Sequence, residues 1–202
     1  MSQLLEIIGR HFDTRNVDQI SQSLGATPEQ TKNGIGAVLP TILAGLAKQA
    51  DEPTSRARLD SALQNDHDGS LLDHLGSLFG GGPTPAAVPN RATAGDSILG
   101  HIFGGRKDRV ADRVSHSSGL TSGQTLKLMM MLAPVVMAAL GKMKRSDNLS
   151  SDQVADTLHT ERNHMQASGG GSIVGRMLDQ DGDGDFDMMD VIKFGAGKLF
   201  RR

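Results

Sequence analysis

The chain has 202 residues, and its 21 Lys and Arg against 23 Asp and Glu give a formal net charge of −2. Its 25 Gly and 7 Pro argue against a single tightly packed globule that uses every position. The absence of Cys excludes disulfides and thiolate metal sites, and the near-neutral charge argues against a protein coated with basic residues for nucleic acid.

The first predicted element is an amphipathic helix in residues 4–12, LLEIIGRHF. Its pattern recurs in residues 71–79, and residues 96–103 hold a shorter relative. Single amphipathic helices of this length are unstable alone, so we expect each to pack on the rest of the chain or on a partner. The first twelve residues lack the basic start, apolar run and cleavage site of a secretory signal, which makes a cytoplasmic protein the expectation.

An internal repeat is the main architectural signal. Residues 20–48 match residues 114–142 at a constant offset of 94, with ten identities in 29 positions. Each copy predicts a short helix, a glycine turn and a second helix with a capping box, Thr27 with Gln30 and Thr121 with Gln124. Pro40 and Pro134 are expected to kink each apolar segment or to begin a new helix there.

No stretch alternates polar and apolar residues over more than a few positions, so the sequence predicts an all-α fold. We expect a small helical bundle built from two tandem helix-turn-helix-like repeats, with the two Pro-containing helices buried against each other. The predicted segments are a first repeat in 1–50, connecting amphipathic helices in 51–79, a flexible Gly- and Pro-rich linker in 80–95, a second repeat in 96–145, a helix in 146–168 capped by Ser150 and Gln153, and a Gly-rich break with an acidic tail in 169–202.

Residues 179–190, DQDGDGDFDMMD, match the twelve-residue EF-hand loop. Alternating carboxylates around a sharp turn supply the oxygen ligands that a hard cation prefers, and the turn falls at Gly184. The sequence therefore predicts an EF-hand-like Ca²⁺ site, open to competition by Mg²⁺, with the ligands Asp179, Asp181, Asp183, Asp185, Asp187 and Asp190. Position 12 holds Asp in place of the longer Glu, which predicts a Kd of about 10⁻⁵ to 10⁻³ M.

A local excess of basic residues lies in the second half of the chain. Residues 97–145 hold eight basic and two acidic side chains, which is typical either of a solvated helix face or of a site for an acidic partner. The candidate polyanion-binding residues are Arg106, Lys107, Arg109, Arg113, Lys142, Lys144 and Arg145. Binding to DNA is an alternative function, although the second helix of each repeat is too apolar for a typical recognition helix.

Enzymatic motifs are absent: the seven His are scattered, and the sequence contains no HExxH, GxSxG or P-loop pattern. We therefore expect a non-enzymatic interaction or scaffold protein that binds a protein partner or self-associates, with no indication of a small-molecule substrate. A membrane-surface role is a second alternative, because Lys193, Lys198, Arg201 and Arg202 accompany apolar residues at the C-terminus.

The paired cores, the segment ILGHIFGG at 98–105 and the acidic tail ending in GAGKLFRR together resemble the bacterial YidB-like proteins of unknown function. The resemblance covers nearly the full chain. It implies a small helical bundle described as homeodomain-like, with an EF-hand-like loop at its C-terminus. It implies no established activity, and it brings no catalytic residues to this sequence.

Overall fold

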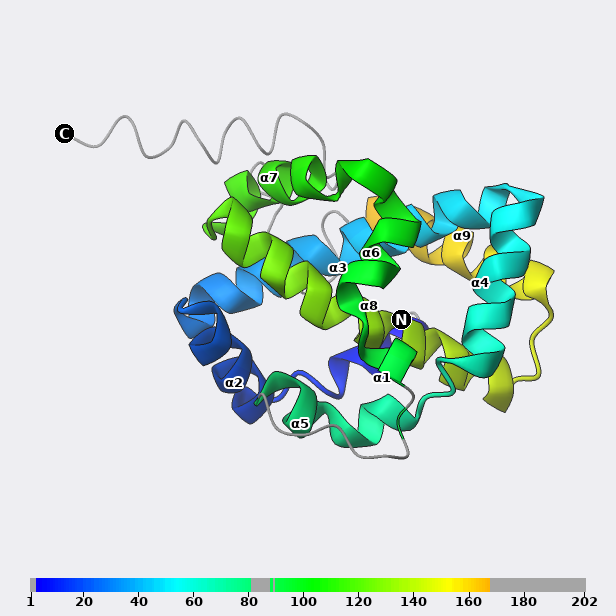
Figure 1. Ribbon diagram of the computed structural model, residues 1–202, viewed down its shortest axis with the longest axis horizontal. Helices are drawn as coiled ribbons and strands as arrows, with labels where there is room; N and C mark the ends of the chain where they lie inside the picture. The colour runs from blue at the N-terminus through cyan, green and yellow to red at the C-terminus, as the bar shows by residue number, and fades with distance from the viewer. Residues whose placement is uncertain (1–2, 81–87, 89, 168–202) are drawn as a thin grey trace.

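The computed structural model describes residues 3–80, 88 and 90–167, and these residues form a bundle of helices with no strand among them (Figure 1). The prediction of an all-α fold is confirmed for this part of the chain. The helices are α1 (Gln3–Gly9), α2 (Thr14–Leu24), α3 (Pro28–Asp51), α4 (Pro53–Asn65), η1 (Ser70–His74), α5 (Leu75–Phe79), η2 (Asn90–Thr93), α6 (Gly95–Phe103), η3 (Gly104–Arg106), α7 (Lys107–Ser118), α8 (Ser122–Ser146) and α9 (Ser151–Ala167).

The two longest helices, α3 and α8, each continue without a break through a proline, Pro40 in α3 and Pro134 in α8. The expectation that a new helix begins at these prolines is therefore wrong. A proline inside a helix costs about 3 kcal/mol through a lost hydrogen bond and a steric clash. Both helices bury much of their length in the core, and this tertiary packing outweighs the local penalty.

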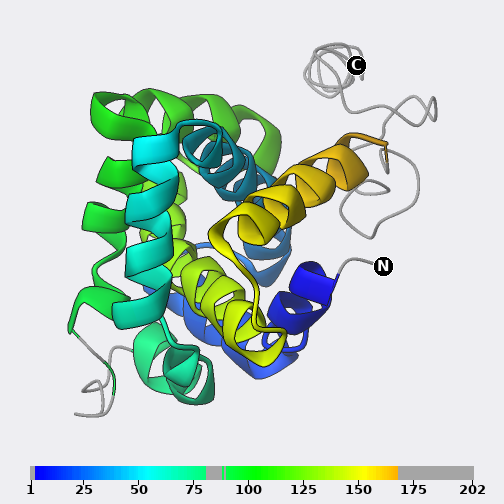
Figure 2. The ribbon, with the colours of Figure 1, turned by 90° about the vertical axis from the view of Figure 1, so that its right-hand side faces the viewer.

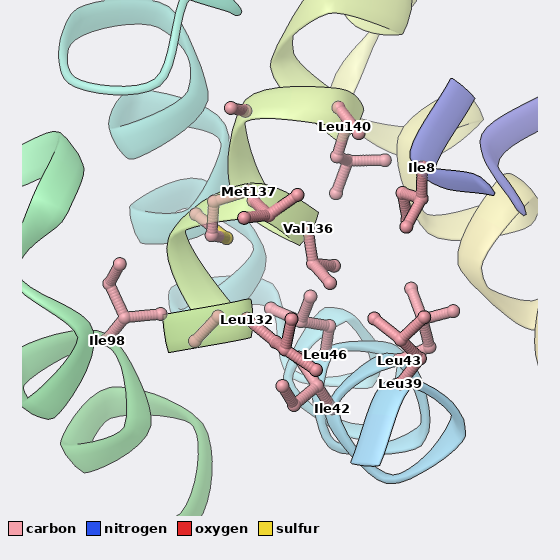
Figure 3. Packing of buried hydrophobic residues seen from close by; sticks show 14 of the residues in the cluster. Ile8, Leu39, Ile42, Leu43, Leu46, Ile98, Leu132, Val136, Met137 and Leu140 are labelled. Carbon is pink, nitrogen blue, oxygen red and sulfur yellow. The ribbon is translucent and has the colours of Figure 1, made fainter. Parts of the chain in front are cut away.

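Helices α3 and α8 pack against each other at the centre of the molecule, which confirms the predicted burial of one Pro-containing helix on the other (Figure 3). The facing side chains are Leu39, Ile42, Leu43 and Leu46 from α3, and Leu132, Val136 and Leu140 from α8. All seven are at most 6% exposed. Each such side chain contributes about 2 kcal/mol when it leaves water, so this contact is a substantial part of the hydrophobic core.

Among the described helices, α8 is long and apolar enough to cross a membrane by length and composition alone. However, 72% of the residues in its apolar window are buried inside the structure, and the core helix of a globular protein meets the same criterion. The surrounding helices, including α1, α4, α6 and α7, cover α8 along its length. Burial against these helices therefore explains the apolar composition of α8.

The predicted capping boxes are present at the start of both long helices. The Oγ1 atom of Thr27 accepts a hydrogen bond from the Gln30 backbone N–H at 3.2 Å, and Gln30 Oε1 accepts one from the Thr27 backbone N–H at 3.0 Å. Thr121 and Gln124 repeat this pair of bonds at 2.9 and 3.2 Å. Each box satisfies two backbone N–H groups at a helix end, so the sequence alone sets where α3 and α8 begin.

The same two glutamines also join the two halves of the molecule. Gln30 Nε2 donates to the backbone carbonyl of Gly119 at 3.0 Å, and Gln124 Nε2 donates to the backbone carbonyl of Gly25 at 3.2 Å. Both glycines end a helix with positive φ, 66° at Gly25 and 72° at Gly119. The offset of 94 relates Gln30 to Gln124 and Gly25 to Gly119, so each copy of the repeat makes the same hydrogen bond to the other copy. A two-fold relation between the two copies would produce this reciprocal contact.

Equivalent positions are filled differently where they meet each other. Gly34 of α3 and Leu128 of α8 are related by the offset of 94 and lie in contact. A Cβ atom on Gly34 would lie 2.8 Å from Leu128 Cδ2 and 2.6 Å from Leu120 Cδ1. One large and one small side chain fill this space, which explains why the two copies differ here.

Helix α9 forms an outer layer beside α3 and α4 (Figure 2). Its bounds agree with the predicted helix within 146–168, and the predicted cap is present, because Ser150 and Gln153 exchange hydrogen bonds of 2.8 and 3.3 Å. Val154, Ala155 and Leu158 are buried by at least 96%. This apolar stripe fixes α9 to the body of the protein.

The end of the predicted linker in 80–95 is packed into the fold. Val88 is 4% exposed and Ala92 is 2% exposed, and η2 leads directly into α6. Gly95 lies so close to the backbone carbonyl of Met130 that an added Cβ atom would be 1.8 Å from its oxygen. Pro134 has no N–H to donate to this carbonyl, which lies four residues before it in α8. The proline thus leaves room on α8 where the chain of α6 approaches.

Candidate functional site

The predicted cation loop lies outside the described residues. All six proposed ligands and Gly184 fall in 179–190, and the basic C-terminal segment also lies beyond α9. Within the part of the chain that the structure describes, no group of three or more His, Cys, Asp or Glu side chains could hold a metal ion. The cation site therefore rests on its sequence pattern.

The predicted polyanion-binding residues fall into two groups, one on η3 and α7 and one at the end of α8. Arg106, Arg109 and Arg113 are exposed, and none of them forms a salt bridge with another described residue. Lys107 instead forms an ion pair with Asp96, and this contact raises the pKa of Lys107. Around α7, three arginines therefore lie on the surface without a salt bridge to the rest of the described chain.

The second group is occupied mainly by contacts within the protein. The Lys144 side chain is 10% exposed, and its Nζ lies 2.7 Å from Asp60 Oδ1 and donates to the Leu149 carbonyl at 2.8 Å. Arg145 donates to the Gln64 carbonyl at 2.8 Å. Lys142 is exposed. Lys144 therefore acts as a buried structural cation that joins α8 to α4.

The helix that would read DNA in a helix-turn-helix unit is largely inside the core. Residues 34–39 of α3 are all buried, and the exposed residues of the helix lie in its first turns and at its C-terminal end. In the second copy, the exposed Lys127 of α8 donates a hydrogen bond to the Ser23 carbonyl. This arrangement leaves little of either helix to enter a DNA groove.

The structure contains a cavity that the sequence did not indicate. It has a volume of about 530 Å³ and lies among α3, α4, α6, α8 and η2. Its larger apolar lining residues are Leu46, Leu59, Ile98, Ile102 and Met137. Small-molecule sites typically have volumes of about 300–1,000 Å³ and a mostly apolar lining, so the cavity has the dimensions of a binding site.

The rim of this cavity is polar and carries more positive than negative charge. Arg58 on α4 and Arg91 on η2 both line it, and both are exposed. Asp66 and His67 follow at the end of α4, and His101 lines the cavity from α6. Among the lining residues that the structure describes, Asp66 is the one acidic side chain. The rim therefore favours an anion.

Local helix geometry explains why α4 provides so much of this site. The lining residues Ser55, Arg58, Leu59, Ala62 and Asp66 recur at intervals of three and four, which places them on one face of α4 and at its C-terminal end. The opposite face carries exposed residues such as Ala57 and Gln64. The spacing of the α4 residues is visible in the sequence, but Arg91 and His101 are too distant in sequence for any motif to link them to Arg58.

His67 is the buried polar residue of the cavity. It is 4% exposed, and its Nδ1 atom is buried without a hydrogen-bond partner among the described residues. Burial lowers the pKa of His67 from its ordinary value, although Asp66 and Asp68 oppose the shift. Burial therefore favours the neutral form of His67 in the folded protein.

This shift predicts a pH dependence of stability. The unfolded chain binds a proton at His67 near pH 6.5, whereas the folded protein resists protonation, so acid favours unfolding. The contribution is present above pH 6.5 and is lost as the pH falls toward the lowered pKa. We expect His67→Gln to flatten the loss of unfolding free energy between pH 6.5 and 5, measured by urea denaturation. If the slope of the unfolding free energy against pH is unchanged, His67 titrates alike in the folded and unfolded states. Some slope is expected to remain in the variant, because burial also lowers the pKa of His11.

Comparison with known proteins gives a family and no function. A family model described as "Bacterial protein of unknown function (DUF937)" matches residues 6–143, which is about two thirds of the chain. The match extends from α1 nearly to the end of α8, so it includes the cavity and leaves out α9. No curated protein and no solved structure matches the sequence. The chain therefore belongs to this family of bacterial proteins of unknown function.

Proposed function

We propose that the protein is a non-enzymatic helical interaction protein whose C-terminal loop binds Ca²⁺. In this proposal the two helix-turn-helix-like units, α2 with α3 and α7 with α8, serve as a rigid scaffold. The resemblance to the YidB-like proteins implies a helical bundle of this kind. The observation that carries the proposal is the spacing of the six aspartates around Gly184 in residues 179–190.

The chemistry of the loop supports a cation as its ligand. Without a cation, six neighbouring carboxylates repel one another by about 1 kcal/mol for each close pair in water. A hard divalent cation removes this repulsion and accepts six to eight oxygen ligands at about 2.3–2.6 Å. Asp187 and Asp190 complete the set behind the turn. Binding is therefore expected to order the loop.

The attachment of α9 supports a link between the loop and the scaffold. Arg56 of α4 pairs with Asp152 at 2.6 Å, and Asp51 of α3 lies 3.1 Å from Nε2 of His159. Together with the buried apolar stripe of α9, these pairs hold the helix that precedes the tail. A loop ordered by Ca²⁺ would then present the C-terminal segment to a partner from a fixed point on the body.

The loop is tested by calorimetry with the full chain. We expect Ca²⁺ to bind with a Kd of about 10⁻⁵ to 10⁻³ M, and Asp181→Asn combined with Asp183→Asn to weaken binding at least tenfold, because both residues occupy ligand positions. Asp108→Asn with Asp156→Asn removes the same charge from exposed sites on α7 and α9 and is expected to leave affinity unchanged. Absence of heat with both Ca²⁺ and Mg²⁺ at millimolar concentration would refute the proposal.

A second candidate function is binding of a polyanion such as DNA by α7. The observation that favours it is the set of three exposed arginines without salt bridges among the described residues, Arg106, Arg109 and Arg113. We expect Arg109→Gln with Arg113→Gln to reduce the salt dependence of duplex binding by about two counterions. Lys48→Gln with Arg15→Gln is the charge-matched control. A gel shift at about 100 mM salt that shows no complex with random duplex would remove this candidate.

A further inference from the structure

We infer that the cavity among α3, α4, α6 and α8 binds a small amphipathic carboxylate, with its apolar chain inside and its carboxylate at the two rim arginines. This inference does not depend on the cation loop, which lies beyond α9 in the sequence. It rests on the apolar lining and the charge of the rim.

The interior of the cavity suits an apolar chain. Its apolar side chains come from four different helices: Leu46 from α3, Leu59 from α4, Ile98 and Ile102 from α6, and Met137 from α8. Each CH₂ group of a ligand that leaves water here gains about 0.8 kcal/mol. Met137 adds a flexible side chain that adapts to ligands of different shape. The lining therefore favours an aliphatic or aryl group.

The rim selects the head group. Arg58 and Arg91 line both the cavity and an adjoining depression along α4, so they lie where the cavity meets the surface. Neither guanidinium group forms a salt bridge or a hydrogen bond with another described residue. Two guanidinium groups bind a carboxylate through paired N–H donors, and Asp66 opposes only one of the two charges. The rim thus retains a net positive charge for an anionic head group.

His67 is a buried polar residue in the lining of the cavity. Its side chain is 96% buried, and its Nδ1 atom has no hydrogen-bond partner among the described residues. A buried polar group without a partner costs about 1–3 kcal/mol. The residue is held in place because its backbone carbonyl packs against Gly141 of α8.

The inference is tested with dodecanoate and the full chain, below the micelle-forming concentration and in the presence of a chelator. We expect a Kd in the micromolar range by calorimetry. Acetate has the head group without the chain, and dodecanol has the chain without the charge; we expect each to bind at least tenfold more weakly. Dodecyl phosphate has the same chain with a phosphate head group. A site for carboxylates is expected to bind it no more tightly than dodecanoate.

Two variants locate the site. Arg58→Gln with Arg91→Gln is expected to weaken dodecanoate binding at least tenfold, and Lys32→Gln with Lys48→Gln removes the same charge at exposed positions of α3 without effect. Ser97→Trp, at an exposed position that lines the cavity, is expected to block binding by filling it. Circular dichroism checks that the variants fold. Absence of binding below 1 mM, or binding that persists in both folded variants, would overturn the inference.

Discussion

Replacing Gly141 by alanine is expected to lower the free energy of unfolding by about 3 kcal/mol. An alanine Cβ at this position of α8 would lie 1.7 Å from the backbone oxygen of His67 and 2.9 Å from its carbonyl carbon. Backbone atoms cannot rotate away as a flexible side chain can, so α8 and the end of α4 must separate. Overpacking a core typically costs 1–3 kcal/mol, and this contact lies at the upper end.

The matched control is Gly123→Ala in the first turn of the same helix, where an added Cβ meets nothing within 4 Å. Alanine is the better helix former by up to about 1 kcal/mol, so this variant is expected to be slightly more stable than the original protein. Urea denaturation followed by circular dichroism measures both. A Gly141→Ala variant as stable as Gly123→Ala would mean that His67 does not pack against α8.

The second large effect is expected at Lys144. Replacing it by methionine keeps the length of the side chain and removes the charge that faces Asp60, whose side chain is 21% exposed. It also leaves the Leu149 carbonyl without the donor that Lys144 provides. Removing one partner of a buried ion pair typically costs 3–5 kcal/mol, and the partial exposure of Asp60 places the expected loss near 3 kcal/mol.

Lys142→Met is the control for Lys144, because Lys142 is exposed two residues earlier in the same helix. Its expected effect on the free energy of unfolding is below about 0.5 kcal/mol. Combining Lys144→Met with Asp60→Leu is expected to restore part of the stability, because the pair is then apolar on both sides. Thermal unfolding compares the stability of these variants. If Lys144→Met and Lys142→Met lose the same stability, Lys144 is a surface residue with no structural role.

Several elements of the fold could be predicted because their causes lie within a few residues of sequence. The capping boxes at Thr27 and Thr121 and the cap at Ser150 fix where three helices begin, through hydrogen bonds over three positions. The left-handed conformation at Gly25 ends α2 for an equally local reason. The match between the two copies also predicted that α3 and α8 would pack together.

The candidate cavity could not be predicted, because its residues meet only after the chain folds. Arg58, Arg91 and His101 come from three different helices, His67 comes from the loop after α4, and the four share no motif. The expectation that a new helix begins at each proline was wrong for a related reason. Local chemistry at Pro40 and Pro134 favours a break, but the apolar faces of both helices are buried against each other.

By itself, the sequence determined the helical class, the helix starts and the internal repeat, because these follow from hydrogen bonds and periodicity between near neighbours. Only the tertiary structure decided which of two equivalent positions must be small. The offset of 94 relates Gly141 to Ala47, and both are buried, yet only Gly141 faces the His67 carbonyl. That contact joins residues 74 positions apart, and such contacts depend on how the helices pack rather than on the residues beside them.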